Sequence, residues 1–310
     1  MRKYKYIFGP VLSRRLGLSL GVDLVPHKTC PLNCVYCECG PTTLLTDERR
    51  EYVNTGEVLE ELSDFLKTSP HLDYITFSGS GEPTLHSRIG EMIKFIKSNF
   101  QNYKVALLTN GVLFTDESVI EEVKDADLIK PSLDAASDEV FVKINRPHNK
   151  LSINKIADGL INLRNRYNGK IYLEVFIVPG INDSPEEIKL ISEIAKKIMP
   201  DKIQLNSLDR PPAADGVRKA ELKELLKIAS YFEPAAEIIS RYDPQQFNIT
   251  TTDIENLIIE MISRRPCTEE ELKIIFSTRI KETKEVISRL LREKKIRIIK
   301  GPRGDYYGVS

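Results

Sequence analysis

The stretch that decides the fold joins a predicted strand to a loop rich in cysteine. It reads Leu18-Ser-Leu-Gly-Val-Asp-Leu-Val25, then a short connection, then Cys30-Pro-Leu-Asn-Cys34-Val-Tyr-Cys37. The alternation of apolar residues over 18–25 predicts a strand. Thiols at this C-x3-C-x2-C spacing can converge on one inorganic centre without help from the rest of the chain. We therefore expect an inorganic site just after the first strand.

The number of thiols indicates the kind of centre. Three ligands (Cys30, Cys34 and Cys37) leave one iron of a [4Fe–4S] cube without a protein ligand and open to a bidentate small molecule. A structural zinc site normally takes four protein ligands. Cys39 offers a fourth thiol, but it lies only two residues beyond Cys37, so both thiolates would have to reach the same ion. The cluster is the favoured interpretation, and zinc is the alternative.

The composition is that of a globular protein. The chain has 310 residues, with 45 Lys and Arg against 45 Asp and Glu, and 41% of its residues are apolar. This supplies a large core and excludes a mainly disordered chain. No apolar run approaches the roughly 18 residues of a membrane span, and no signal sequence follows Met1. We expect a cytoplasmic protein, in which clustered cysteines serve metal binding or catalysis rather than disulfides.

Strand-like and helix-like segments alternate up to about residue 235. The predicted strands are Leu18–Val25, Asp73–Ser78, Lys104–Thr109, Leu128–Ser132, Lys170–Val178 and Lys202–Leu208. One of the helices between them begins at Ser184-Pro-Glu-Glu187, an N-cap followed by proline. Such alternation is typical of parallel βαβ units. Six units are too few for an eightfold barrel, so the predicted fold class is α/β, a partial (β/α)6 barrel.

The pattern changes near the C-terminus. Helices are predicted over Ile254–Ile262, Thr268–Ser277 and Ile280–Glu293, and a hairpin pairs Lys295–Lys300 with Asp305–Val309. Three short helices followed by a hairpin are the layout of a winged helix. The predicted domains are a barrel over residues 1–240 and a small winged-helix domain over residues 248–310.

The predicted C-terminal domain is basic. From Ser277 to Arg303 the chain carries ten Lys or Arg and three Glu, a local net charge of +7. This predicts a surface for a polyanion, and a well-solvated helix is the alternative. Tyr306 and Tyr307 end the hairpin, where they would stack on bases or pack the hairpin against the helices.

The cysteine spacing, with an aromatic residue (Tyr36) before the third cysteine, resembles the signature of the radical S-adenosylmethionine (radical SAM) superfamily. The resemblance implies an enzyme with a [4Fe–4S] cluster whose unique iron chelates S-adenosylmethionine. One electron, from a donor of the flavodoxin or ferredoxin type, then cleaves the sulfonium. The resulting 5′-deoxyadenosyl radical abstracts hydrogen from a substrate.

The end of the second predicted strand supports the resemblance. Ser78-Gly-Ser-Gly-Glu-Pro83 resembles the glycine-glycine-glutamate motif of the family. This implies that Gly79, Ser80, Gly81 and Glu82 bind S-adenosylmethionine. Glycines permit close approach of the backbone, and carbonyls with a carboxylate can accept hydrogen bonds from an ammonium group. A strand-to-helix turn is the alternative interpretation.

Later strands end in further candidates. Similarity to relatives of the molybdenum-cofactor cyclases implies that Asn110, Ser132 and Asp134 contact the nucleoside, although Asn110 also suits a turn and Ser132 a cap. The same resemblance implies that Arg146 pairs with the methionine carboxylate; a solvated arginine is the alternative. Asn182 lies in a segment similar to the one that packs against adenine. All follow strands, on the edge where barrel active sites form.

Residues without a motif assignment also lie near the expected site. His27 and Lys28 adjoin the cysteine loop, where they would contact substrate, tune the cluster or have no role. Asp209 and Arg210 follow the last strand and are candidates for substrate contact.

Among subgroups, Phe8-Gly-Pro-Val-Leu-Ser-Arg-Arg-Leu-Gly17 and the loop from Cys30 to Gly40 resemble the wyosine-base synthases, Fe–S enzymes that modify a tRNA guanosine. Those enzymes carry a second cluster, whereas only Cys39 and Cys267 remain here. The predicted substrate is therefore a tRNA or RNA nucleoside, without the wyosine reaction. The alternatives are radical modification of a peptide and a redox-sensing regulator that binds DNA.

Overall fold

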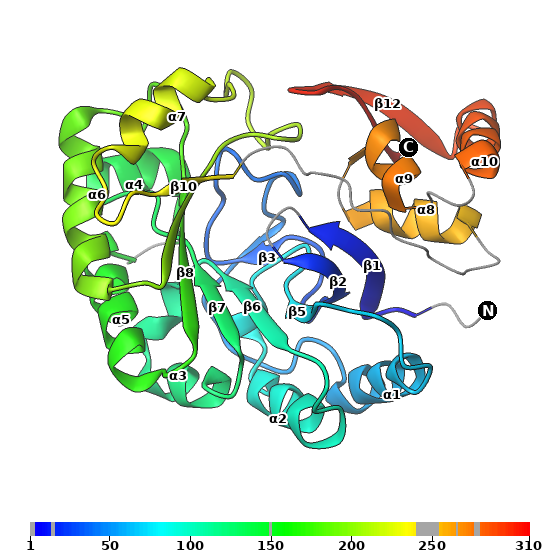
Figure 1. Ribbon diagram of the computed structural model, residues 1–310, viewed down its shortest axis with the longest axis horizontal. Helices are drawn as coiled ribbons and strands as arrows, with labels where there is room; N and C mark the ends of the chain where they lie inside the picture. The colour runs from blue at the N-terminus through cyan, green and yellow to red at the C-terminus, as the bar shows by residue number, and fades with distance from the viewer. Residues whose placement is uncertain (1–3, 14–15, 149–150, 240–253, 265, 276–279) are drawn as a thin grey trace.

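A computed structural model describes residues 4–13, 16–148, 151–239, 254–264, 266–275 and 280–310. Its central feature is an eight-stranded sheet in the order β1-β2-β5-β6-β7-β8-β9-β10 (Figure 1). All neighbouring pairs are parallel except β1–β2. The strands are β1 (Ile7–Ser13), β2 (Gly17–Val22), β5 (Tyr74–Phe77), β6 (Val105–Thr109), β7 (Leu128–Pro131), β8 (Lys170–Phe176), β9 (Lys202–Asn206) and β10 (Glu237–Ile238).

Helices connect the parallel strands and lie along one face of the sheet (Figure 1). They are α1 (Thr55–Leu66), α2 (Ile89–Asn99), α3 (Glu117–Val123), α4 (Asp138–Asn145), α5 (Ile153–Arg166), α6 (Pro185–Ile198) and α7 (Leu222–Ala229), with short 3-10 turns η1 (Pro83–Leu85) and η2 (Val112–Thr115). The α/β class and the six predicted strands are confirmed. The sequence did not predict β1, which folds back on β2, or the short β10.

The start of α6 shows how local sequence sets these elements. Ser184 accepts a hydrogen bond from the backbone N–H of Glu187 at 3.2 Å, and Pro185 occupies the first turn, as predicted. The carboxylate of Glu187 also accepts hydrogen bonds from the N–H groups of Ala136 (2.6 Å) and Ser137 (3.0 Å). This contact ties the beginning of α6 to the loop after β7, at the carboxyl edge of the sheet.

The two faces of the sheet differ. Residues that face the helices, such as Ile75, Ile129 and Ile171, are fully buried in the main core. Tyr74 and Tyr172, one position away, belong to a smaller apolar cluster and are only partly buried. Because side chains alternate along a strand, the face opposite the helices is the more open one.

The C-terminal module has its own sheet and core. Its elements are α8 (Ile254–Arg264), β11 (Cys267–Thr268), α9 (Glu269–Ile275), α10 (Ile280–Arg292), β12 (Ile296–Gly301) and β13 (Gly304–Val309), and its strand order is β11-β13-β12. The predicted helices and hairpin are confirmed, whereas the winged-helix assignment remains a prediction. The proposed domain boundary falls in residues 240–253, outside the described residues.

Charged residues join this module to the barrel side. Arg210 follows β9, is 2% exposed, and lies 2.5 Å from Glu271 of α9. Its Nε atom is 3.6 Å from Glu38, which belongs to the cysteine loop. Arg303 lies 3.0 Å from the carboxylate of Asp209. Asp209 and Arg210 are therefore engaged at this interface rather than held free for a substrate.

The two hairpin tyrosines are packing residues. Tyr306 is fully buried and its hydroxyl donates to the carbonyl of Asp209. Tyr307 is 8% exposed and belongs to the core of the C-terminal module. Of the two alternatives predicted for them, packing rather than stacking on bases is confirmed, because both rings are buried.

Candidate functional site

The cysteine loop lies at the carboxyl edge of the sheet and begins at Cys30 in the two-stranded pair β3 (Thr29–Cys30) and β4 (Leu44–Leu45). A turn brings the N–H of Cys37 to the carbonyl of Cys34 at 3.1 Å. The N–H of Val35 donates to the carbonyl of Ile144 at 2.9 Å, which holds the loop against the end of α4. Cys30, Cys34 and Cys37 are free thiols of intermediate exposure.

Each of these cysteines receives a hydrogen bond from a different part of the chain. Lys28 donates to Cys37 at 2.9 Å. The side-chain amides of Asn110 and Asn145 donate to Cys30 (3.5 Å) and to Cys34 (3.3 Å), respectively. The loop thus presents sulfur atoms that are already oriented by N–H donors, as metal-bound thiolates usually are.

The electrostatics of the thiols are unequal. Burial raises the pKa of Cys30 to about 12, and the carboxylate of Glu82 adds to this effect. The thiol of Cys39 and the ammonium of Lys28 lower the pKa of Cys37 to about 5. Metal ligation requires thiolates, so iron binding would displace protons from the buried thiols.

The donor set fits a cluster better than a single ion. Within the described parts of the chain, no three His, Cys, Asp or Glu side chains are grouped closely enough to hold one metal ion. In a cube each cysteine binds a different iron, so the thiols need not reach a common atom. Cys39 instead directs its thiol at the carbonyl of Gly79, at 3.8 Å. The zinc alternative therefore has no ligand set in this structure.

The Ser78–Pro83 segment packs directly against the cysteine loop. Gly79 has φ +133°, and an added Cβ would lie 2.5 Å from the carboxyl group of Asp23. A Cβ on Gly81 would lie 2.4 Å from the carbonyl oxygen of Thr29. Ser80 donates to Asp23 at 2.9 Å. Glycine is required at both positions, because the backbone must approach its neighbours this closely.

Glu82 is the most constrained member of that segment. It is 3% exposed and accepts hydrogen bonds from the hydroxyls of Thr84 (2.6 Å) and Thr109 (2.7 Å) and from the backbone N–H of Asn110 (2.8 Å). Burial raises its pKa, and these donors oppose the shift. The carboxylate therefore also fixes the ends of β5 and β6 relative to each other.

Tyr36 and Asp134 form the other side of the site. The ring of Tyr36 stacks on Phe176 with centroids 3.9 Å apart, and its hydroxyl donates to Asp134. Asn145 also donates to this carboxylate, at 3.0 Å. Burial raises the pKa of Asp134 to about 6. Asn182 donates to the carbonyls of Asp134 and Phe176, both at 2.8 Å. It therefore links the segment after β7 to the end of β8.

Two other candidates lie at the margin. Ser132 is half-buried and bridges to Glu174 on the neighbouring strand. Arg146 is exposed and ends α4 in the left-handed conformation, with φ +45°. The structure therefore brings together the cysteines, Tyr36, residues 79–82, Asn110, Asp134 and Asn182, and leaves the Arg146 side chain outside this group. Its assignment to the methionine carboxylate stays a prediction.

Polar residues continue from the site onto the open face of the sheet. Lys130 is 2% exposed and forms an ion pair of 2.6 Å with Glu174. Asn206 donates to the same carboxylate at 3.2 Å, and Gln204 donates to Glu237 at 3.4 Å. The amide oxygens of Gln204 and Asn206 are buried without a hydrogen-bond partner.

Comparison with known proteins identifies the family. A family model described as "Radical SAM superfamily" matches residues 24–191, which contain the cysteine loop and the Ser78–Pro83 segment. The chain belongs to the radical SAM superfamily. Its cofactors are a [4Fe–4S] cluster and S-adenosylmethionine, and Cys30, Cys34 and Cys37 are the thiols that would hold the cluster.

Several known proteins align with most of this radical SAM protein. A "UPF0026 protein" of Helicobacter pylori strain J99 is 35% identical over 305 residues, covering 97% of this chain and 96% of that protein. A Brachyspira hyodysenteriae protein named "GTPase Obg" is 36% identical over 302 residues, but this chain spans only 44% of its length. A probable dual-specificity RNA methyltransferase RlmN of Thermotoga sp. is 23% identical over 64% of this chain and 57% of that protein.

Among solved structures, a radical SAM methyltransferase from Sphaerobacter thermophilus matches with a TM-score of 0.56 and 15% identity, over 73% of this chain and 67% of that one. This similarity concerns the fold alone. It agrees with the mostly parallel sheet.

Sequence reasoning missed several residues of the site. Asn145 precedes Arg146 in the motif that was singled out, yet only the folded helix shows that the asparagine is the residue that contacts Cys34. Phe176 ends β8 and had no signal beyond its place in an apolar strand. Lys130 and Glu174 gave a weak signal, because a lysine and a glutamate interrupt apolar strands at positions that share one face.

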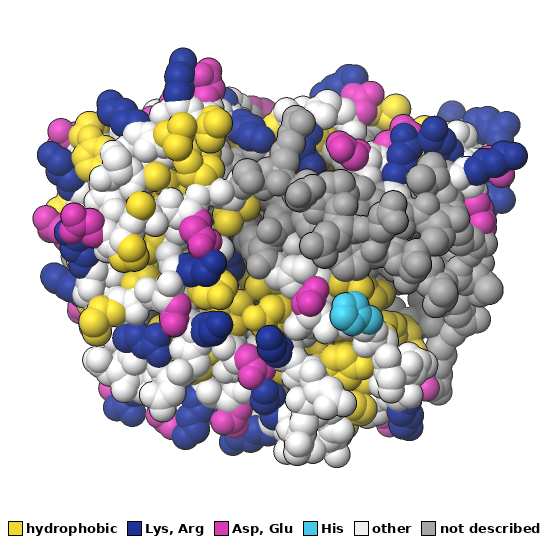
Figure 2. Space-filling view, viewed as in Figure 1, with side chains coloured by type: hydrophobic (Ala, Val, Ile, Leu, Met, Phe, Trp, Pro, Cys, Tyr) yellow, Lys and Arg dark blue, Asp and Glu magenta, His cyan; other side chains and the backbone are white. Residues whose placement is uncertain are grey.

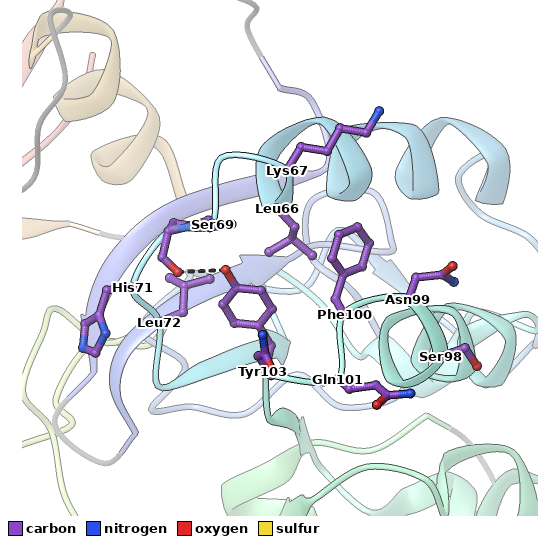
Figure 3. A pocket seen from close by; sticks show the side chains of 12 residues that line it. Leu66, Lys67, Ser69, His71, Leu72, Ser98, Asn99, Phe100, Gln101 and Tyr103 are labelled. Carbon is purple, nitrogen blue, oxygen red and sulfur yellow. Dashed lines mark hydrogen bonds between the residues drawn. The ribbon is translucent and has the colours of Figure 1, made fainter.

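A hollow of about 700 Å³ lies elsewhere, between the segment after α1 and the turn after α2 (Figure 3). Leu66, Leu72, Phe100 and Tyr103 are among its lining residues, and Tyr103 donates to the carbonyl of Pro70 at 2.9 Å. These segments precede β5 and β6, so the hollow adjoins the amino ends of the strands. It is at the opposite edge of the sheet from the cysteines and is not part of the site.

Proposed function

We propose that this protein is a radical SAM enzyme that removes a hydrogen atom from a nucleoside of tRNA or another RNA. The observation that carries the proposal is the convergence of the three cysteines with residues 79–82 at one edge of a parallel sheet. The cluster, when bound, supplies the electron that cleaves S-adenosylmethionine. The chain itself orients the thiols and places Tyr36 and Asp134 on the side of the site where the nucleoside would bind.

The open face of the sheet supports a nucleoside as substrate. The side chains of Gln204 and Asn206 are neutral amides, and the Lys130–Glu174 pair next to them is electrically neutral. A neutral base would adjoin this face without adding an unpaired charge. The partial barrel is the arrangement that would place such a base near the cofactor.

The C-terminal module supports RNA as the larger substrate. Its order of elements, α8-β11-α9-α10-β12-β13, suits the winged helix that we propose for it. Lys and Arg side chains gather over α10 at the edge of the molecule (Figure 2). Arg289, Lys295 and Lys300 form ion pairs with acidic neighbours, whereas Lys294, just before β12, and Arg297, within β12, are exposed. Arg279 lies outside the described residues.

We also infer that the enzyme works in the cytoplasm with a flavodoxin or ferredoxin as electron donor. All five cysteines are free, which suits a reducing compartment. No helix in the described ranges combines the length and apolar composition of a membrane span.

Release of 5′-deoxyadenosine tests the central proposal. Anaerobically reconstituted protein with dithionite and S-adenosylmethionine should release it slowly, and bulk tRNA from a strain that lacks the gene should accelerate the release. Absence of 5′-deoxyadenosine from a protein that holds its cluster would contradict radical SAM activity. Acceleration by a peptide pool, and not by tRNA, would replace RNA with a peptide substrate.

The salt dependence of RNA binding tests the C-terminal module. If basic residues neutralise phosphates, log K for bulk tRNA should fall with log salt, with a slope of about −0.7 to −0.9 per phosphate contacted. Replacing Lys294, Lys295 and Arg297 together with Ala should flatten this slope. The control replaces Lys189, Lys196 and Lys197 of α6, which are equally exposed. An equal change of slope in both variants would show that only the net charge of the protein matters. It would contradict a docking role for the C-terminal module.

A further inference from the structure

We propose that Lys28 sets the reduction potential of the iron–sulfur cluster through a charged hydrogen bond to Cys37. Lys28 is the cationic member of the three donors that contact the cysteines, and its Nζ–Sγ distance of 2.9 Å is the shortest of the three. The inference concerns the cluster, which belongs to the family, and is independent of the RNA substrate.

The lysine is held rigidly in this position. It is 3% exposed and adopts the left-handed conformation, with φ +57°, which residues other than glycine rarely occupy. Its N–H donates to the carbonyl of Ser80 at 2.9 Å, and its carbonyl accepts from Thr43 at 3.0 Å. Such strain persists where the surroundings fix it, typically at a functional site. The backbone hydrogen bond to Ser80 thus fixes Lys28 at a position from which its ammonium group reaches Cys37.

The burial of Lys28 argues against the other roles considered for it. Lys28 is 3% exposed, and its ammonium group donates to the sulfur of Cys37. An ammonium group buried without a partner is strongly unfavourable, so this lysine depends on an anionic neighbour. Cys37 is that neighbour, and a thiolate bound to iron keeps the negative charge.

Charge near the cluster then favours one oxidation state. Reduction adds an electron, so a fixed positive charge stabilises the reduced cluster and raises its potential. Carboxylates of Glu82 and Asp134 act in the opposite direction near Cys30 and Cys34. Asn110 and Asn145 donate hydrogen bonds but carry no charge, and charged donors form the stronger bonds. Lys28 therefore offsets the two acidic groups and makes the cluster easier to reduce.

An EPR-monitored redox titration of the reconstituted protein, without S-adenosylmethionine or substrate, tests this role. Lys28→Met should lower the equilibrium constant for reduction of the cluster at least tenfold. This corresponds to a fall of at least about 59 mV in the one-electron reduction potential. Lys28→Arg keeps the charge and should stay near the wild-type potential, whereas Lys28→Gln keeps only a neutral donor and should fall between them. Iron and sulfide are counted in each variant, and Lys28→Gln serves as the neutral variant if Lys28→Met loses the cluster.

The control is Lys143→Met, which removes the same charge from an exposed position of α4, two residues from Asn145. An unchanged potential in the neutral Lys28 variants, or an equal shift in Lys143→Met, would overturn the inference. Either result would leave 5′-deoxyadenosine formation untouched as the test of the proposed enzyme. Conversely, a protein that releases no 5′-deoxyadenosine can still show the Lys28 shift.

Discussion

Replacing any one of Cys30, Cys34 and Cys37 with Ala should abolish the cluster and, with it, all release of 5′-deoxyadenosine. The wild-type chain should bind about four iron and four sulfide, because three thiolates suffice for a cube. Each variant leaves two of the three ligand thiols, and the donors supplied by Lys28, Asn110 and Asn145 cannot replace a ligand. Iron and sulfide analysis after anaerobic reconstitution measures the loss.

Cys267→Ala is the matched control for these variants. Cys267 is 1% exposed and lies in the core of the C-terminal module, so its loss removes a buried thiol without touching the loop. It should bind the full complement of iron. Tightly bound zinc without sulfide in the wild-type protein would show that the site holds a different metal.

Arg210→Met should destabilise the folded chain by about 1.5–3 kcal/mol, because it removes a charged hydrogen bond to Glu271, which then keeps only Arg303 as its partner. Glu271 lies 2.5 Å from this guanidinium, and Glu38 lies 3.6 Å from it. Unfolding in urea, followed by circular dichroism, measures the change in the free energy of unfolding. We expect the C-terminal module to lose its contact with the barrel first, so the variant should unfold in two steps.

The control for this change is Arg218→Met. Arg218 pairs with Glu224 at 2.6 Å, but its side chain is 53% exposed, and exposed pairs contribute at most about 1 kcal/mol. A similar small effect in both variants would mean that the Arg210 contacts do not hold the two parts together.

The site could be predicted from the sequence as far as its residues follow strands. Cys30, Glu82, Asn110 and Asp134 each lie shortly after a predicted strand, and parallel strands bring their carboxyl ends to one edge. Chain direction alone therefore collects them. The same rule does not reveal that Lys28 and Asn145 donate hydrogen bonds to cysteine sulfur atoms. Those contacts depend on the left-handed conformation of Lys28 and on the position at which α4 ends.

The packing of the C-terminal module could be predicted from the sequence less well than the site. Tyr306 precedes Tyr307 in a hairpin whose charge suggested contact with nucleic acid, yet both rings are buried. Nothing in the local sequence distinguishes a tyrosine that packs from one that is exposed. The decision depends on Asp209 and Arg303, which approach Tyr306 from the barrel side and from the hairpin turn. The antiparallel strand β1 was not predicted either, because no helix separates it from β2 and the prediction depended on alternating strands and helices.

The two ends of the large sheet bear on aggregation. An open sheet leaves its outer strands ready to pair with another chain. Here β10 has only two residues, and β1 carries Pro10 and an irregular register between Phe8 and Val11. Val11 also packs against the core of the C-terminal module. Neither outer strand therefore offers a long, regular backbone ladder, which protects the chain from edge-to-edge association when it is concentrated for anaerobic work.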